Sequence, residues 1–523
     1  MQLHDAPVAS AANSVNVGRL LTGIARQFPG RTAIRSGDRT ITYGEFNQRV
    51  DSLARGLSEI GLAVGDRVVI WSHNCPEFLE TMFACWKTGL AVVPMNARLT
   101  PDEVNFHVRD CAARALVYGA GFGEGAREIE VEHRIGIGSD EDIGYETLAD
   151  SPAADEPVRD FPEETPAWIF YTSGTTGKPK GAVLTHRNLA FVVVSWCADL
   201  YQMQPEDVVL HCAPLSHGAG FHALVGLARG AENIVHGKWD PAVFSADVQR
   251  RGVTVSWLVP TQIRMLLDSP ALAGADLSSL KCVVYGGSPM YVEDLKEAIT
   301  RIGPVFCQLF GQGESPMTIS YLRREEHRLE RSDTEVLASA GVVRTGMEVA
   351  IAGTDGKEMS AGEAGEILVR GPAVMAGYWE RPEETAEALK GGWLHTGDLG
   401  KLDEHGYLYV LDRKKDFIIS GGSNVYAREV EDVLLEHPAI VEAAVFGVPD
   451  RLWGEAVTAA VVGEGLDPQE VIAYCRKAMA DYKCPKRIFV CVALPKNAYG
   501  KVLKRQLRER FAGEAGTAVS VAG

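Results

Sequence analysis

The stretch TSGTTGKPKG at residues 172–181 combines residue types that bind phosphate. Its glycines let backbone N–H groups approach an anion closely. Its side chains add hydroxyl donors and positive charge, from Ser173, Thr175, Thr176, Lys178 and Lys180. The spacing is not that of a Walker A loop, because Gly177 follows Gly174 too soon and Pro179 stands where that loop needs a hydroxyl. The sequence therefore predicts a phosphate loop of another kind, between an apolar strand and a helix-like run that begins THRNLAFVVV.

Other chemistry-bearing side chains stand in glycine-rich or turn-like contexts far along the chain. Glu314 lies in GQGE, and a carboxylate there offers an oxygen ligand for Mg²⁺. Asp398 lies in HTGD, His217 in PLSHGAG and Lys501 in YGKVLKR. Taken singly, each also has an ordinary structural interpretation as a solvated charge or a buried histidine. The order of these stretches along the chain, and their occurrence together, decide between a chemical role and an ordinary structural one.

The elements that position these residues follow an alternating pattern. Short β-branched runs such as residues 66–72 and 91–96 flank helical stretches such as 75–89. This alternation predicts α/β layers with largely parallel sheets. From about residue 341 the chain becomes strand-rich, which favours a smaller β unit, and after residues 412–416 a compact α+β domain begins.

Composition excludes several classes of protein. The 523 residues are 46% hydrophobic and 23% charged, and the net charge of −17 disfavours a general nucleic-acid binder. The N-terminal stretch has no signal-peptide pattern and the apolar runs are too short to span a bilayer, so we expect a cytoplasmic protein without a membrane span. The ten cysteines form no C-x-x-C pair and are expected to be reduced thiols.

Seven stretches together resemble the adenylate-forming superfamily, which includes acyl-CoA synthetases, aryl-CoA ligases, luciferases and adenylation domains. TSGTTGKPKG resembles its phosphate loop. Six further stretches match in the expected order: PLSHGAG (214–220), YGGSP (285–289), LFGQGESP (309–316), GWLHTGDLG (392–400), DRKKDFIISGGSNVYAREVE (412–431) and PKNAYGKVLKRQLR (495–508). The chain is closest in pattern to fatty-acyl-CoA or aryl-CoA ligases, and the resemblance covers it from about residue 20 to 510.

The resemblance implies a fold and a reaction. The α/β fold would consist of a large N-terminal AMP-binding domain, residues 1–414, with layered α/β subdomains and a β-rich subdomain, and a small mobile α+β C-terminal domain, residues 415–523. A carboxylate would attack the α-phosphate of ATP, giving acyl-adenylate and pyrophosphate, and the thiol of CoA would then displace AMP. The implied cofactors are ATP, Mg²⁺ and CoA.

The resemblance also assigns roles to residues. Lys501, His217 and Glu314 would be catalytic, with Glu314 the magnesium ligand. Nucleotide-binding residues would be Thr172, Ser173, Gly174, Thr175, Thr176, Gly177, Lys180, Gly287, Ser288, Pro289, Phe310, Gly311, Gly313, Asp398 and Arg413. Lys415 would be the hinge between the domains, Gly421 and Gly422 would line the pantetheine channel, and Phe221, Leu224 and Val225 would line the acyl pocket. One departure stands out, because the family usually has threonine where this chain has Gly313.

The acid and its acceptor stay open at this point. No Asp or Glu lies between residues 208 and 231, which disfavours an amino acid because its buried ammonium group would lack a partner. Apolar fatty acids and aryl or cinnamate-like acids both fit. The alternative is an adenylating enzyme that passes the acyl group to a separate carrier protein or an amine, or that activates an oxyanion such as nitrite. A homodimer is the default expectation for an enzyme.

Overall fold

The computed structural model describes residues 15–139, 142–150, 158–172, 179–288, 290–329, 335–413, 418–420, 423–450, 453–496 and 502–512. The chain divides into two compact units. The first unit consists of Met1–Pro289, Lys296–Val349 and Val369–Leu394, and the second of Met290–Leu295, Ala350–Leu368 and His395–Gly523. A domain boundary between residues 414 and 415 stays a prediction, and the expected hinge Lys415 lies outside the described residues.

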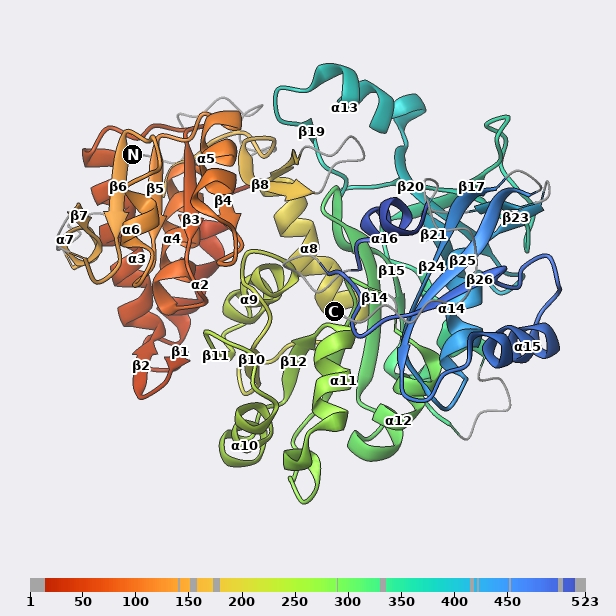
Figure 1. The fold of residues 1–523 in the computed structure, drawn as a ribbon. Coiled ribbons are helices and arrows are strands. Elements are labelled where there is room, and N and C mark those ends of the chain that lie inside the picture. The colour runs from red at the N-terminus through yellow and green to blue at the C-terminus, as the bar shows by residue number, and fades with distance from the viewer. Residues whose placement is uncertain are drawn as a thin grey trace. The chain divides into compact units, whose positions relative to one another are not determined.

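One sheet of the first unit has eight strands in the order β19-β9-β8-β4-β3-β5-β6-β7 (Figure 1). Its strands are β3 (Arg67–Trp71), β4 (Ala91–Met95), β5 (Ala115–Tyr118), β6 (His133–Gly136), β7 (Ile143–Gly144), β8 (Pro166–Thr172), β9 (Lys180–Thr185) and β19 (Gly377–Tyr378). The pairs from β8 to β7 are parallel, whereas β8–β9 and β9–β19 are antiparallel. The continuous apolar runs of β4 and β5 are wholly buried, as parallel strands covered on both faces require.

The other large sheet has nine strands in the order β16-β15-β14-β13-β12-β10-β11-β1-β2. Its strands are β1 (Thr32–Ser36), β2 (Arg39–Thr42), β10 (Val208–His211), β11 (Glu232–Val235), β12 (Val255–Leu258), β13 (Cys282–Tyr285), β14 (Phe306–Gln312), β15 (Ser315–Leu322) and β16 (Val342–Val343). The pairing is parallel from β1 through β14 and antiparallel at both edges. The predicted largely parallel α/β layers are therefore confirmed.

The helices between these strands begin at recognisable capping signals. Thr42, Thr100 and Thr185 each form a capping box that satisfies the first free N–H groups of the helix that follows. The helices that begin between residues 18 and 382 are α2 (Gly18–Gln27), α3 (Tyr43–Glu59), α4 (Pro76–Thr88), α5 (Pro101–Asp110), α6 (Gly123–Ala126), α7 (Tyr145–Ala149), α8 (His186–Asp199), α9 (Gly218–Ala228), α10 (Pro241–Arg251), α11 (Pro260–Asp268), α12 (Val292–Ile302) and α13 (Pro382–Ala388).

The β-rich part expected after residue 341 is a four-stranded sheet, most of which belongs to the second unit. Its order is β17-β18-β20-β21, formed by β17 (Glu348–Ala352), β18 (Gly365–Arg370), β20 (Leu394–Leu402) and β21 (Leu408–Arg413). The C-terminal part has β22 (Ile418–Ser420), β23 (Ser423–Val425), β24 (Ile440–Asp450), β25 (Gly454–Gly463) and β26 (Arg487–Val490), with helices α14 (Ala427–Leu435), α15 (Pro468–Ala478) and α16 (Lys504–Phe511).

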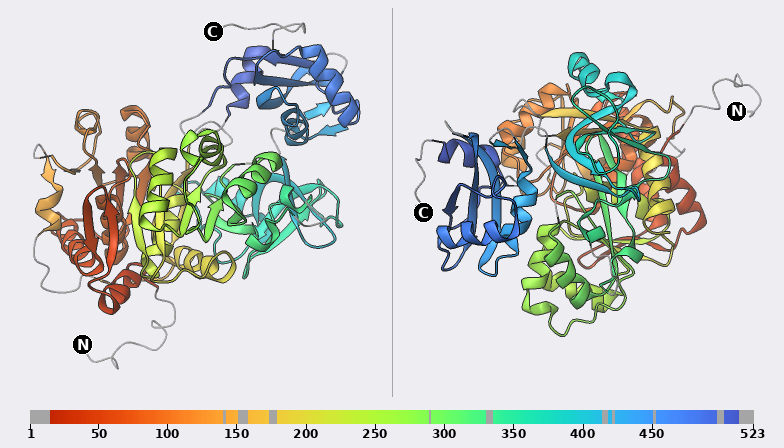
Figure 2. Two further views of the ribbon diagram at one scale, coloured as in Figure 1. Left: turned by 90° about the horizontal axis from the view of Figure 1, so that it is seen from below. Right: turned by 90° about the vertical axis from the view of Figure 1, so that its right-hand side faces the viewer.

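The C-terminal sheet is covered on both faces, and Figure 2 shows its strands in blue as one layer with helices against it. Alternate residues of β24 enter different cores, as the two-residue period of a strand dictates. Ala443 and Val445 pack with α14 and α15, while Ala444 and Phe446 pack with α16. This confirms the compact α+β part that the sequence predicts at the C-terminus.

The surroundings of the phosphate loop differ from the prediction of a loop between an apolar strand and a helix-like run. Residues Lys180–Thr185 form strand β9, which pairs antiparallel with β8, and helix α8 begins only at His186. The loop therefore joins two strands of a hairpin. The short apolar run GAVL lies between a proline and a helix cap, and its pairing with β8 decides its strand conformation.

No helix of the described residues is long and apolar enough to cross a bilayer. All ten cysteines fall within the described ranges and are free thiols, eight of them buried.

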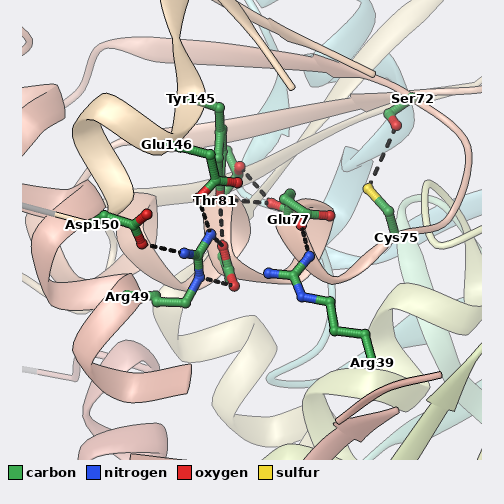
Figure 3. A network of polar contacts seen from close by, with 10 residues as sticks. Arg39, Arg49, Ser72, Cys75, Glu77, Thr81, Tyr145, Glu146 and Asp150 are labelled. Carbon is green, nitrogen blue, oxygen red and sulfur yellow. Dashed lines mark hydrogen bonds and ion pairs between the residues drawn. The ribbon is translucent and has the colours of Figure 1, made fainter. Parts of the chain in front are cut away.

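A buried polar network joins α3, α4 and α7 (Figure 3). The Arg49 guanidinium donates to both oxygens of Glu80, at 2.8 and 3.1 Å, and pairs with Glu146 and Asp150. The Glu80 side chain is fully buried, and it also accepts a hydrogen bond from the Tyr145 hydroxyl at 2.9 Å. Burial raises the pKa of Glu80 even though Arg49 opposes the shift.

Replacing Arg49 with methionine is expected to lower the free energy of unfolding by about 3–5 kcal/mol, because a buried carboxylate is left uncompensated. The deficit relative to the unaltered protein should shrink as the pH falls from neutral, since the raised pKa lets Glu80 become neutral in the folded state above the ordinary pKa of glutamate. Urea unfolding of both proteins across acidic and neutral pH measures this difference. Arg19→Met is the matched control, because the pair of Arg19 with Asp160 is exposed and a change below about 1 kcal/mol is expected. Equal effects of the two substitutions would contradict the account.

Candidate active site

The β8–β9 hairpin fixes the two ends of the phosphate loop. Thr172 is the last residue of β8 and Lys180 the first of β9, and the two pair directly across the hairpin. The register brings the hydroxyl and the amine to the same end of the sheet. Ser173 to Gly177, which the sequence predicts to bind phosphate, lie outside the described residues.

Glu314 stands in the turn between β14 and β15, and it is 9% exposed. Two hydroxyl groups donate hydrogen bonds to one of its oxygens, Oε1: that of Thr172 at 3.1 Å and that of Tyr378 at 2.8 Å. The Lys180 ammonium lies 5.4 Å from the centroid of the Tyr378 ring, at cation–π distance. Three residues predicted from the sequence, Thr172, Lys180 and Glu314, are thus brought together.

Tyr378 is the residue of this cluster that the sequence interpretation missed. It belongs to the short strand β19, which pairs with β9 through Tyr378 and Ala182, and its N–H donates to the Thr385 hydroxyl at 2.9 Å. Burial, and after it the Glu314 carboxylate, raises its pKa, so the phenol stays protonated and acts as a donor. The only sequence signal beside Tyr378 is the preceding residue, Gly377. In the structure its φ is 152° and it lies close to Thr385, so the backbone there is constrained.

The donor set around Glu314 suits a hard cation such as Mg²⁺. Both hydroxyl bonds go to Oε1, and within the described ranges no donor contacts Oε2. Those ranges contain no cluster of three or more histidine, cysteine or acidic side chains arranged for a metal. Magnesium is commonly held by one or two carboxylates together with phosphate oxygens and water. The single, oriented carboxylate of Glu314 fits that coordination pattern.

The predicted adenine turn and the aromatic segment lie at the carboxyl ends of neighbouring parallel strands, β13 and β14. Gly287 follows β13 with a φ of 83°, which favours glycine, and Ser288 comes next. Phe310 is half-buried and Gly311 has no room for a side chain, since a Cβ there would lie 2.4 Å from the backbone nitrogen of Met317. The register therefore places Gly287, just after β13, at the same end of the sheet as Phe310 of the neighbouring strand β14, where ligands of open α/β sheets bind.

In the second unit, Asp398 and Arg413 are cross-strand partners on β20 and β21. The Arg413 Nε lies 3.4 Å from Asp398 Oδ1, and the aspartate is 5% exposed. The Asp398 N–H donates to the Thr396 hydroxyl at 3.1 Å, which fixes the turn that carries the carboxylate. The two residues that the sequence assigns to the ribose are therefore neighbours.

His217 precedes the first turn of α9, and its Nδ1 lies 3.0 Å from the Ser216 hydroxyl. Burial lowers its pKa to about 4, so the imidazole is neutral at physiological pH. The Phe170 ring contacts it edge to face, with 5.2 Å between ring centroids. A neutral imidazole acts on a substrate carboxylate through one hydrogen bond rather than through charge.

The predicted acyl-pocket residues lie on α9 and belong to the core. Phe221 is 1% exposed and stacks on Trp168, with ring centroids 4.3 Å apart, and Leu224 and Val225 are equally buried. Their role as pocket lining stays a prediction.

Several predicted site residues lie outside the described ranges, and their roles also stay predictions: Ser173, Gly174, Thr175, Thr176, Gly177, Pro289, Lys415, Gly421, Gly422 and Lys501.

Residues 21–379 match the family model described as AMP-binding enzyme, and residues 429–501 match that described as AMP-binding enzyme C-terminal domain. The chain is 38% identical to a feruloyl-CoA synthase from an Amycolatopsis species, over 93% of this chain and 97% of that protein. It is 34% identical to the medium/long-chain-fatty-acid–CoA ligase FadD8 of Mycobacterium tuberculosis, over 96% and 91% of the two chains. Among solved structures, the amide bond synthetase McbA from Marinactinospora thermotolerans superposes with a TM-score of 0.87 at 30% identity, over 95% of this chain and 100% of that one.

Proposed function

Because the chain belongs to the AMP-binding enzyme family, we propose that it is an AMP-forming acid–CoA ligase acting on an apolar fatty or aryl carboxylic acid. The observation that carries this proposal is the cluster beside the phosphate loop in which Thr172 and Tyr378 donate to Glu314 and the Lys180 ammonium lies over the Tyr378 ring. These groups suit a triphosphate with its metal at the end of the β8–β9 hairpin. The resemblance seen in the seven sequence motifs agrees with the family.

In the first half-reaction a carboxylate oxygen of the acid attacks the α-phosphorus of ATP, and pyrophosphate leaves. Lys180 and the backbone of the loop would hold the departing phosphates, while Glu314 would hold Mg²⁺. The bound metal would neutralise part of the phosphate charge, so that two anions can approach each other. His217 would donate one hydrogen bond to the carboxylate, and Asp398 and Arg413 would bind the ribose.

In the second half-reaction the sulfur of CoA attacks the acyl carbon, AMP leaves and the thiol proton is released. Gly421 and Gly422 are proposed to let the backbone approach the thin pantetheine arm, and Lys415 is proposed as the pivot between the two half-reactions. We also propose that the protein is located in the cytoplasm and that it forms a homodimer.

A second candidate differs only in the acceptor. The similarity to an amide bond synthetase supports an enzyme that forms the same adenylate and passes the acyl group to an amine. A separate carrier protein as acceptor, and nitrite in place of the acid, are the remaining alternatives.

A screen of fatty, cinnamate-like and other aryl acids for pyrophosphate release, with and without CoA, tests the proposal. We expect acid-dependent pyrophosphate without CoA, and CoA thioester plus AMP when CoA is added. Pyrophosphate without thioester, followed by amide when an amine is added, would support the second candidate. Absence of any acid-dependent pyrophosphate would overturn both.

A further inference from the structure

Gly313 is a glycine for steric reasons. Its φ lies outside the left-handed region, so the backbone itself does not demand glycine. A Cβ at this position would lie 2.4 Å from Thr172 Cγ2 and 2.6 Å from Phe170 Cδ1, far inside van der Waals contact. Any side chain at 313 must therefore displace Thr172, Phe170 or both.

These two neighbours lie on one face of β8, because side chains two residues apart on a strand project the same way. Thr172 holds Glu314 through its hydroxyl. Phe170 contacts the His217 ring edge to face, with an interplanar angle of 73°. Gly313 thus lies against two side chains, one that supports the proposed metal carboxylate and one that supports the proposed acid-binding histidine.

The Phe170 contact restrains the imidazole in a way that a hydrogen bond alone does not. The Ser216 hydroxyl meets only Nδ1 of His217. An edge-to-face aromatic contact sets the plane of the second ring as well as its distance. Phe170 also lies near Phe221, with ring centroids 6.0 Å apart, so its ring is held from the core side.

We propose that Phe170 is a positioning residue for His217, and that Gly313 is required because the Phe170 ring and the Thr172 methyl group occupy the space of a side chain at 313. The inference rests on the proposed ligase function. It gives the departure at 313 a physical account: the chain has an aromatic ring where the missing side chain would lie. It also predicts two separable effects of crowding at residue 313, one on the half-saturation constant for the acid and one on that for Mg²⁺.

The chain allows the two effects to be separated by substitution. Thr172→Ser removes the crowding methyl group and keeps the hydroxyl that binds Glu314. Phe170→Ala removes the crowding ring edge and, with it, the contact to His217. Gly313→Ala adds the single carbon atom that collides with both.

The experiment measures acid-dependent exchange of pyrophosphate into ATP at varied acid and varied Mg²⁺. Gly313→Ala should raise the half-saturation constants for acid and for Mg²⁺ by about tenfold each. Adding Thr172→Ser should restore the Mg²⁺ constant and leave the acid constant high. Phe170→Ala alone should raise only the acid constant, and adding Gly313→Ala to it should raise that constant no further.

Strict additivity of Gly313→Ala and Phe170→Ala on the acid constant, or an unchanged acid constant in Gly313→Ala, would overturn the inference. Gly226→Ala is the control for crowding alone, because a Cβ there would lie 2.5 Å from Asn233 Oδ1 within the core around α9. It should lower the unfolding temperature without changing either constant, and a rise in both would also overturn the inference. An unaltered protein without acid-dependent exchange would overturn the proposed function itself, whereas an active one with an additive cycle overturns only this inference.

Discussion

Glu314→Gln is expected to lower acid-dependent pyrophosphate release on the order of 10³-fold. Glutamine has nearly the same shape and keeps an oxygen that accepts from Thr172 and Tyr378, so the turn between β14 and β15 should persist. What is lost is the negative charge that pairs with Mg²⁺ beside the phosphates. Initial rates at rising Mg²⁺ measure the effect, and excess metal should restore little activity.

Two companion variants sharpen this prediction. Tyr378→Phe removes one of the hydroxyl groups that orient Glu314 and keeps the ring under Lys180, so Mg²⁺ affinity should fall about 10–100-fold. Glu404→Gln, at an exposed turn, is the matched control and should leave the Mg²⁺ dependence unchanged. A Glu314→Gln protein with the Mg²⁺ dependence of the unaltered protein would remove Glu314 from the metal site.

Lys501→Ala is expected to lower adenylate formation on the order of 10²–10³-fold while sparing thioester formation from supplied acyl-adenylate and CoA. The first step joins a carboxylate to a polyphosphate, so a lysine that bridges them acts where negative charge accumulates. The second step displaces AMP from a neutral acyl carbon and needs no such bridge. Lys496 and Val502, which flank the segment with Lys501 in the sequence, form an antiparallel bridge shortly before α16.

The two half-reactions are measured separately, by pyrophosphate release and by thioester formation from synthetic adenylate. Lys477→Ala, an exposed lysine of α15, is the control and should affect neither step. Equal loss of both steps in Lys501→Ala would contradict the assignment.

The sequence predicts the parallel layers and much of the Glu314 cluster. Buried parallel strands such as β4 are continuous apolar runs, and glycine-rich turns mark where Glu314 and Asp398 stand, so local pattern is enough to find them. The same patterns place Thr172 and Lys180 at the ends of one loop. The contact of Thr172 with Glu314 joins two different sheets, which no local pattern specifies. The resemblance to a known family is what assigns both residues to one site.

Other features depend on contacts that no local pattern specifies. The sequence predicts a phosphate loop before a helix-like run but does not predict strand β9, because the pairing of β9 with β8 is what makes it a strand. Tyr378 was missed because it sits on a two-residue strand 64 positions after Glu314. The stacking of Phe221 on Trp168 cannot be read from an apolar helix such as α9, and the expected role of Phe221 in the acyl pocket stays a prediction.

The most direct test of the central claim, that the acid is activated through an acyl-adenylate, follows isotopic oxygen in the best acid of the pyrophosphate screen. The enzyme is given ATP, CoA and the acid with both carboxylate oxygens labelled as ¹⁸O. Attack of a carboxylate oxygen on the α-phosphorus predicts AMP that carries one ¹⁸O atom, with none in pyrophosphate. Label in phosphate or pyrophosphate, or unlabelled AMP accompanied by thioester, would contradict the account.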